Sequence, residues 1–328
     1  GRHLDWPLTM KSVRQLPPQL MIKALADLVM RPKAIDDSFE SYVLSQYGKT
    51  ITDNFFRGYT KKFLGLSLKD CHQDWAKASI DRAIIDKDIR SSNIIELLFS
   101  SVKNRKVITK FHYPSNGPID LFPTLLAEEI IKNGGEIITN VCPQKAFMKK
   151  DAVEKIIDTN GKEYELDFLF WSGSTYGLEK IFNFQESRLY YCGTLLCNLL
   201  VEGNPPADNV QWEYFSSTEI VFSRISFNTS FNPCLAPQGC FGVCAELIFP
   251  ENELVTIDPQ EYQEIIIENL LQTKVIHNKS GIIDIQFEKV FNTYPIYRID
   301  YLKQLESYRL KIQQIKNLTA FGRSGAFW

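Results

Sequence analysis

The last eight residues are the feature that most constrains this chain, and they read Phe321-Gly322-Arg323-Ser324-Gly325-Ala326-Phe327-Trp328. Two glycines flank one arginine directly after an apolar segment. Glycine permits a tight turn and a close approach of the backbone to a ligand. Backbone N–H groups at such a turn, with a guanidinium beside them, suit an anion such as a phosphate. A cofactor-binding loop of this kind usually lies inside a fold, so we expect the chain to be part of a longer polypeptide.

Composition and charge exclude several classes of function. The 328 residues are enough for one large domain or two ordinary ones. With 37 basic and 39 acidic residues the net charge is −2, which argues against nucleic acid or an anionic membrane as the main partner. Seven cysteines without CxxC spacing predict reduced thiols in a cytoplasmic protein and no metal site. The most apolar window, 189–201, is too short to cross a bilayer, so we expect no transmembrane segment.

The periodicity of apolar residues predicts an interleaved α/β (α+β) organisation. Residues 1–105 are expected to be helical, 106–178 to form an α/β block, 179–300 an antiparallel sheet, and 301–328 a short return to the α/β block. Within the block, 119–133 is predicted to be a helix, 136–139 a strand, and 169–171 a buried strand that runs into a turn of small residues. The apolar side chains expected to face inward from that helix are Leu121, Leu125, Leu126 and Ile130.

Five stretches carry a resemblance to a known family, in order along the chain. They are Trp6-Pro7-Leu8; 39–48 with 55–62 and Trp75-Ala76; 113–118 with 134–137; 223–226 with 231–233 and Glu246; and 294–297 with 322–325. Together they resemble the FAD-dependent amine-oxidase-like superfamily, and they are most similar to the branch of UDP-galactopyranose mutase and protoporphyrinogen-oxidase-like proteins.

The resemblance implies a bound FAD and a two-domain architecture. In this scheme 1–105 and 179–300 belong to the substrate domain, while 106–178 and 301–328 belong to the FAD-binding domain. It also implies cofactor contacts from two parts of the chain. The residues concerned are Val141, Pro143, Ser172, Gly173, Gly322, Arg323 and Gly325.

One departure from the family pattern is plain. The family begins with a strand, a GxGxxG turn and a helix that hold the FAD pyrophosphate, and this chain has no GxGxxG. The FAD site would therefore be incomplete in 1–328, and apolar edges around 134–175 would be left exposed. We expect material on both flanks of the site to lie outside this sequence.

The candidate ligand contacts are arginines, tyrosines and one loop. Arg224, Arg298 and Arg323 would converge on a diphosphate or on FAD, since guanidinium groups suit phosphate oxygens; surface ion pairing is the plainer interpretation. Tyr294 and Tyr297 flank Pro295-Ile296, a spacing that places two phenols at one cavity or two aromatic rings at a strand end. His112 and Asn116 belong to a loop that would lie near the substrate, although a lone histidine is more often structural.

Three functions remain open from the sequence. The first is a flavin-dependent mutase (isomerase) acting on a nucleotide sugar for polysaccharide synthesis, in which no catalytic residue of the protein is assigned because the flavin carries the chemistry. The second is an FAD-dependent oxidase or desaturase with a long apolar pocket around Phe55, Phe56, Tyr59 and Phe63. The third is a non-catalytic interaction module. In the first two the partner is a small-molecule substrate, and homo-oligomers are possible in all three.

Overall fold

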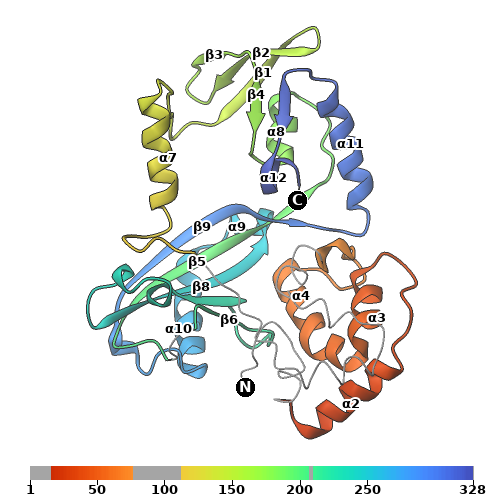
Figure 1. Ribbon diagram of the computed structural model, residues 1–328, viewed down its shortest axis with the longest axis vertical. Helices are drawn as coiled ribbons and strands as arrows, with labels where there is room; N and C mark the ends of the chain where they lie inside the picture. Colours follow the sequence, from red (N-terminus) through yellow and green to blue (C-terminus); the bar gives the residue numbers. More distant parts are fainter. Residues whose placement is uncertain (1–15, 77–111, 207–209, 328) are drawn as a thin grey trace.

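The computed structural model describes residues 16–76, 112–206 and 210–327. Figure 1 shows three parts: a helical region, a long twisted sheet across the middle, and an α/β block on the opposite side of the sheet. The predicted α+β class is confirmed. The predictions for Trp6-Pro7-Leu8, for helices after Ala76, and for most of a strand at 106–113 lie outside the described residues, and residues 112–113 are irregular.

The helical region contains α2 (Pro18–Val29), α3 (Phe39–Ile51), the π-helix η1 (Thr52–Arg57) and α4 (Gly58–Leu64). Ser38 caps α3, because its hydroxyl accepts a hydrogen bond from the Ser41 amide at 3.1 Å. Gly48 does not end the helix; at φ +73° it forms a kink inside α3. A side chain at position 48 would collide with Asp27 of α2. The glycine therefore allows α2 and α3 to lie close together.

The central sheet has the strand order β6-β7-β8-β5-β9 and is antiparallel throughout. Its long middle strand, β5 (Tyr190–Glu202), alternates buried and partly buried residues over most of its length. It pairs with β8 (Cys240–Pro250) and β9 (Ile282–Ile296). The shorter strands β6 (Trp212–Tyr214) and β7 (Arg224–Phe227) extend the sheet beyond β8.

Two hydrophobic cores lie on either side of this sheet. One contains α10 (Gln263–Gln272), whose Ile266 and Leu270 are fully buried against residues of β5, β7 and β8. The other core joins the helical region to the α/β block. Short helical turns connect the strands: η3 (Asn228–Ser230), η4 (Pro233–Leu235), α9 (Glu251–Leu254), η5 (Pro259–Tyr262) and η6 (Lys279–Gly281).

The α/β block is built from two separated segments of the chain. Strands β1 (Pro143–Lys149), β2 (Ala152–Asp158) and β3 (Glu163–Glu165) form an antiparallel meander. Strand β4 (Leu169–Trp171) pairs in parallel with β10 (Leu318–Ala320). Helices α8 (Thr175–Ile181), α11 (Tyr301–Gln313) and the short α12 (Gly322–Gly325) complete the block. Residues 169–171 and 318–320 are therefore strand neighbours, as the interleaved order requires.

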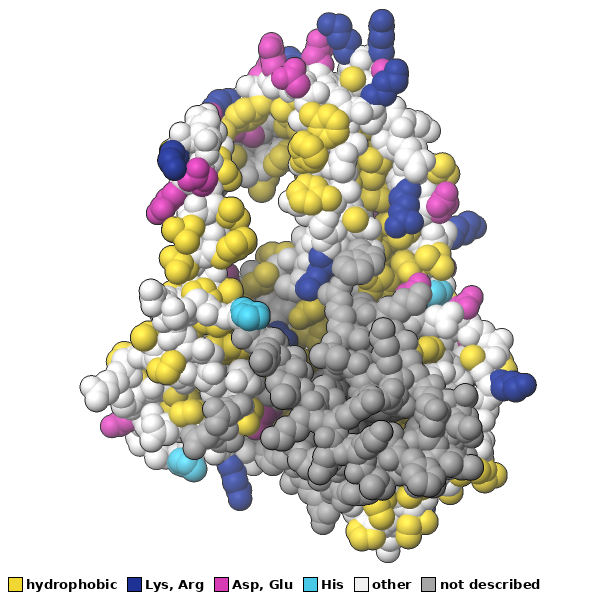
Figure 2. All heavy atoms as spheres, in the orientation of Figure 1, with side chains coloured by type: hydrophobic (Ala, Val, Ile, Leu, Met, Phe, Trp, Pro, Cys, Tyr) yellow, Lys and Arg dark blue, Asp and Glu magenta, His cyan; other side chains and the backbone are white. Residues whose placement is uncertain are grey.

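Helix α7 (Leu121–Lys132) contradicts the expected inward face. It contains no buried residue, and Leu125, Leu126 and Ile130 are about half exposed, because no other described element packs over this helix. Residues 136–139 are irregular, and β4 is not a buried strand, since Phe170 is 68% exposed. Figure 2 shows an opening with hydrophobic walls between α7 and the β4 side of the block. The expected exposure of apolar side chains around 134–175 is confirmed.

The described residues contain neither a membrane-spanning helix nor a metal site. No helix within 16–76, 112–206 and 210–327 is both long enough and apolar enough to cross a bilayer. Over the same ranges, no group of histidine, cysteine and acidic side chains is arranged to hold a metal ion.

The uncovered face of α7 predicts unequal costs for two leucine truncations. Leu247→Ala, at a β8 position that is 1% exposed, should lower the free energy of unfolding by about 2–5 kcal/mol. Leu125→Ala, at a position that is 53% exposed, should cost less than about 1 kcal/mol because little apolar contact is lost. Urea unfolding of both variants measures this difference. Similar losses in the two would show that α7 is covered in solution.

Candidate functional site

A row of charged and aromatic side chains crosses one end of the central sheet. Tyr214 of β6 lies opposite Arg224 of β7, and Arg224 lies opposite Glu246 of β8. Side chains directly opposite each other in neighbouring antiparallel strands share one face of the sheet. The pairing therefore brings these three residues together, although they are far apart in the sequence.

Arg224 and Glu246 form an ion pair that is largely shielded from water. The Nε and Nη2 atoms of Arg224 each lie 2.7 Å from Oε1 of Glu246, and the Glu246 side chain is only 10% exposed. Burial opposes the charge of Arg224, but the Glu246 carboxylate outweighs burial and raises the pKa of the guanidinium further above its usual range. Arg224 also lies over the Tyr214 ring, 5.9 Å from its centroid. Its charge is thus compensated within the protein.

Tyr294 joins this row to the helical region and to α12. Its ring contacts Phe63 of α4 with centroids 5.1 Å apart. The Arg323 guanidinium of α12 lies over the same ring, 5.2 Å from the centroid, and donates a hydrogen bond to the Thr293 carbonyl at 3.1 Å. Among the described residues Arg323 has no carboxylate partner. It therefore supplies a positive charge that stays exposed beside Tyr294.

The phenols of the site remain neutral over the physiological pH range. Burial, and then the nearby Tyr214, raise the pKa of Tyr59 above its ordinary value. Burial also raises the pKa of Tyr294, although Arg224 and Arg323 act in the opposite direction. The Tyr59 ring lies 6.3 Å from that of Tyr214 and 5.4 Å from that of Phe63. Neutral phenols offer O–H donors to anionic ligand oxygens.

Lys62 connects α4 to the loop between β6 and β7. Its Nζ donates hydrogen bonds to the carbonyls of Phe215, Ser217 and Phe222 at 3.1, 3.0 and 2.5 Å. Burial lowers the pKa of this ammonium to about 8. The loop thus receives three hydrogen bonds from a single partly buried charge.

The predicted ligand contacts do not all meet. Arg224, Arg323 and Tyr294 come together as expected. Tyr297 does not face the same cavity, because it is 5% exposed and packs against Trp75, Tyr301 and Phe327. Arg298 does not converge with the other two arginines; its guanidinium lies over the Tyr190 ring at 5.5 Å.

His112 and Asn116 are exposed on the loop before α7. Asn232 fixes this loop to the sheet, because its amide nitrogen donates to the carbonyls of Pro114, Ser115 and Gly117 at 3.0, 3.3 and 3.2 Å. The loop therefore keeps a defined place next to the sheet. Neither His112 nor Asn116 contacts the group formed by Tyr59, Tyr214, Arg224, Tyr294 and Arg323, which we call the Tyr294 cluster.

Five of the seven predicted cofactor residues, Ser172, Gly173, Gly322, Arg323 and Gly325, lie where β4 and β10 end. A side chain on Gly325 would lie 2.5 Å from the Trp171 carbonyl, and one on Gly173 would meet the Trp171 ring at 2.9 Å. These two glycines therefore serve close packing of α12 against the turn after β4. Gly322 differs, since it has φ +73° and open space where a side chain would be. Ser172 lies in the same turn, while Val141 and Pro143 lie at the start of β1.

The turn at Gly322 and Arg323 could hold an anionic group of a cofactor or substrate. The open space above Gly322 lets a ligand reach the backbone, and the Arg323 guanidinium stands beside it without a carboxylate partner in the described chain. The opening with hydrophobic walls in Figure 2 lies between α7 and the β4 side of the block. The glycine turn that would hold a pyrophosphate is absent from the sequence.

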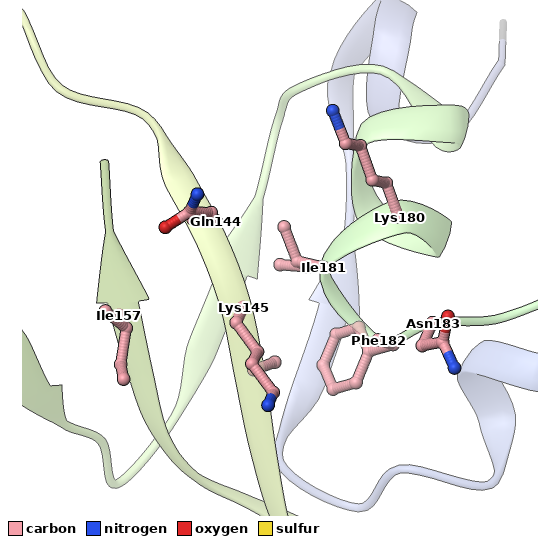
Figure 3. Close-up of a pocket in the computed structure, with 8 residues that line it drawn as sticks. Gln144, Lys145, Ile157, Lys180, Ile181, Phe182 and Asn183 are labelled. Carbon is pink, nitrogen blue, oxygen red and sulfur yellow. The ribbon is translucent and has the colours of Figure 1, made fainter. Parts of the chain in front are cut away.

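A separate pocket of ≈ 680 Å³ lies between β1 and the end of α8 (Figure 3). Gln144, Lys145 and Ile157 line one side, and residues 180–183 line the other. Lys145 and Lys180 point toward opposite ends of it. Since their ammonium groups do not converge, the pocket has no evident anion-binding centre, and it shares no residue with the Tyr294 cluster.

Comparison with solved structures identifies the fold. A reduced UDP-galactopyranose mutase superposes with a TM-score of 0.79 at 17% identity, over 96% of this chain and 68% of that chain. A protein assigned as a protoporphyrinogen oxidase from Exiguobacterium sp. 255-15 gives 0.71 at 11% identity, over 97% and 71%. A putrescine oxidase variant gives 0.55 at 11% identity, over 97% and 71%.

The chain has the fold of the FAD-dependent amine-oxidase-like superfamily. The resemblance seen in the sequence is thereby confirmed at the level of fold. No protein-family model and no curated protein sequence matches the chain. At 11–17% identity the superpositions carry the architecture and not the substrate.

Two residues of the cluster were not singled out as ligand contacts. Tyr214 is reached only through the β6–β7 pairing, and a three-residue strand gives a weak periodic signal. Tyr59 was expected in an apolar pocket, but the neighbouring Phe56 and Phe63 are buried in the core. The signal available in the sequence was the alternation in 223–226, which places Arg224 on the opposite face from the buried Ile225.

The shielded ion pair predicts that removal of Glu246 is costly. Glu246→Gln should lower the free energy of unfolding by about 3–5 kcal/mol, because the buried Arg224 charge loses its partner. The matched control is Glu264→Gln, which breaks the exposed pair with Lys279 and should cost less than about 1 kcal/mol. Chemical unfolding measures both. Equal, small losses would contradict the burial of the Arg224–Glu246 pair.

Lys62 makes the stability of the chain depend on pH. Burial lowers its pKa from an ordinary 10.5 to about 8, so the unfolded chain binds more protons than the folded chain between these values. The free energy of unfolding must then rise with pH across this window. We expect a steeper rise in the wild type than in Lys62→Met when unfolding is followed from about pH 8 to about pH 10. Parallel pH profiles would contradict the assignment.

Proposed function

We propose that this chain belongs to a flavin-dependent enzyme that acts on a nucleotide sugar, as a mutase does, and that the cluster around Tyr294 and Arg323 contacts FAD and substrate. The observation that carries the proposal is the guanidinium of Arg323 above Tyr294, which has no carboxylate partner among the described residues and lies next to open space at Gly322. The architecture is shared with a UDP-galactopyranose mutase at a TM-score of 0.79, and the nucleotide-sugar substrate is taken from that protein as part of the proposal.

In this proposal the protein supplies position and charge, and bound FAD supplies the redox or nucleophilic chemistry. Arg323 attracts anionic oxygens, because its positive charge has no carboxylate partner in the described chain. Tyr59 and Tyr294 remain protonated, since burial raises the pKa of both, and therefore act as donors. Arg224 is bound to Glu246, so it shapes the floor of the site and does not act as a free anion receptor.

The runner-up is an oxidase or desaturase of the same superfamily. It was expected to have an apolar pocket around Phe55, Phe56, Tyr59 and Phe63. In the structure Phe56 packs against Phe39 and Tyr47, and Phe63 packs against Trp75 and Tyr294. These side chains fill the core and do not line a long cavity. The geometry favours a polar, anion-binding site.

Arg323→Ala tests the proposal most simply. We expect the full-length protein that contains this chain to bind FAD and UDP, measured by flavin fluorescence and by calorimetry, and we expect the variant to lose at least about tenfold in affinity for one or both. Arg309→Ala, at an exposed position of α11, is the matched control and should bind as the wild type does.

Two outcomes would contradict parts of this proposal. An absence of both FAD and UDP binding by the wild type would favour an interaction module. Flavin binding with steady reduction of a redox dye by an amine or apolar substrate would favour the oxidase, because a mutase produces no net redox change.

A further inference from the structure

Lys62 holds both ends of the loop that carries two residues of the proposed site. Tyr214 precedes Phe215, and Arg224 follows Phe222 by two residues. The Lys62 ammonium donates to the carbonyls of Phe215 and Phe222 at 3.1 and 2.5 Å. A third hydrogen bond, of 3.0 Å, reaches Ser217 in the middle of the loop. One side chain thereby fixes the strand ends on which Tyr214 and Arg224 stand.

The same helix supplies a third member of the cluster. Tyr59 precedes Lys62 by three residues on α4, so the two side chains emerge from nearly the same face of the helix. The Tyr59 ring meets that of Tyr214 at 6.3 Å. Lys62 thus sets the distance between α4 and the β6–β7 loop at the point where Tyr59 and Tyr214 touch.

Stability alone does not account for a charge at this position. Lys62 is shielded enough for burial to lower the pKa of its ammonium to about 8, so the charged form is disfavoured relative to water. A methionine of similar length would avoid this desolvation. The three hydrogen bonds to carbonyls of the β6–β7 loop are what the ammonium supplies at this position and a methionine cannot.

We infer that Lys62 is a positioning residue, which clamps the loop between β6 and β7 and so holds Tyr214 and the Arg224–Glu246 pair in place as the floor of the proposed nucleotide site. The inference rests on the proposed function for the identity of the ligand. The clamp itself follows from the three carbonyl contacts. The sequence alone does not distinguish Lys62 from the adjacent Lys61, which is exposed in the structure.

The experiment compares Lys62→Met, Lys62→Arg and Lys61→Met in the full chain with FAD present. UDP is the probe, and its affinity is measured by calorimetry at pH 7. We expect Lys62→Met to bind UDP at least about tenfold more weakly, while its melting temperature stays within a few degrees of the wild type. Lys62→Arg, which can still donate to several carbonyls, should stay within about threefold, as should Lys61→Met.

A second measurement needs no ligand. Hydrogen–deuterium exchange of residues 213–224 should be faster in Lys62→Met than in the wild type and Lys61→Met, because the loop loses its clamp. If the wild type fails to bind UDP, the proposed function fails, and this exchange experiment still tests the clamp. Unchanged exchange, or a loss of UDP affinity that follows a parallel loss of melting temperature, would overturn the inference.

Discussion

The pairing of β5 with β9 is the constraint on which the rest of this structure depends. Strand β9 runs alongside β5 from Val201 back to Tyr190, with one register shift between Leu200 and Val201 and a second opposite Gly193, where Asn292 adopts φ +55°. This bulge lets β9 continue to Tyr294, which lies opposite Cys192. From there the chain enters α11 and returns through β10 to α12. The register of one strand pair therefore determines that Arg323 is placed above Tyr294.

The site combines one compensated arginine and one exposed arginine, and this difference gives it its character. Arg224 is neutralised by Glu246 and forms part of a rigid floor, whereas Arg323 keeps its charge available at the edge of the opening. A flat or anionic ligand would contact neutral phenols on one side and a single guanidinium on the other. The pairing of Arg224 follows from strand register, whereas Arg323 lies on α12, where it has no carboxylate partner among the described residues.

The sequence predicted the positions of the main strands and helices better than it predicted which segments would pack against them. Alternating apolar residues identified β5, β8 and most of β9, because one face of each strand is buried. The same reasoning placed Leu125 and Ile130 of α7 inward, yet it could not say what would cover them. The Arg224–Glu246 pair and the contact of Tyr59 with Tyr214 join distant segments, so no local spacing reveals them. The sequence prediction put Tyr297 in the site together with Tyr294. The three-residue spacing between them cannot tell which of the two faces the site and which packs into the aromatic core.

The central claim is that Arg323, held above Tyr294, forms one side of a flavin site. A double-mutant cycle on FAD affinity tests it most directly, using Arg323→Ala, Tyr294→Leu and the double variant. Cation–π contact between the two side chains predicts that their effects are coupled by roughly 0.5–1 kcal/mol, so that the double variant loses less than the sum of the single losses. Strictly additive losses, or single variants that bind FAD as well as the wild type, would contradict the account.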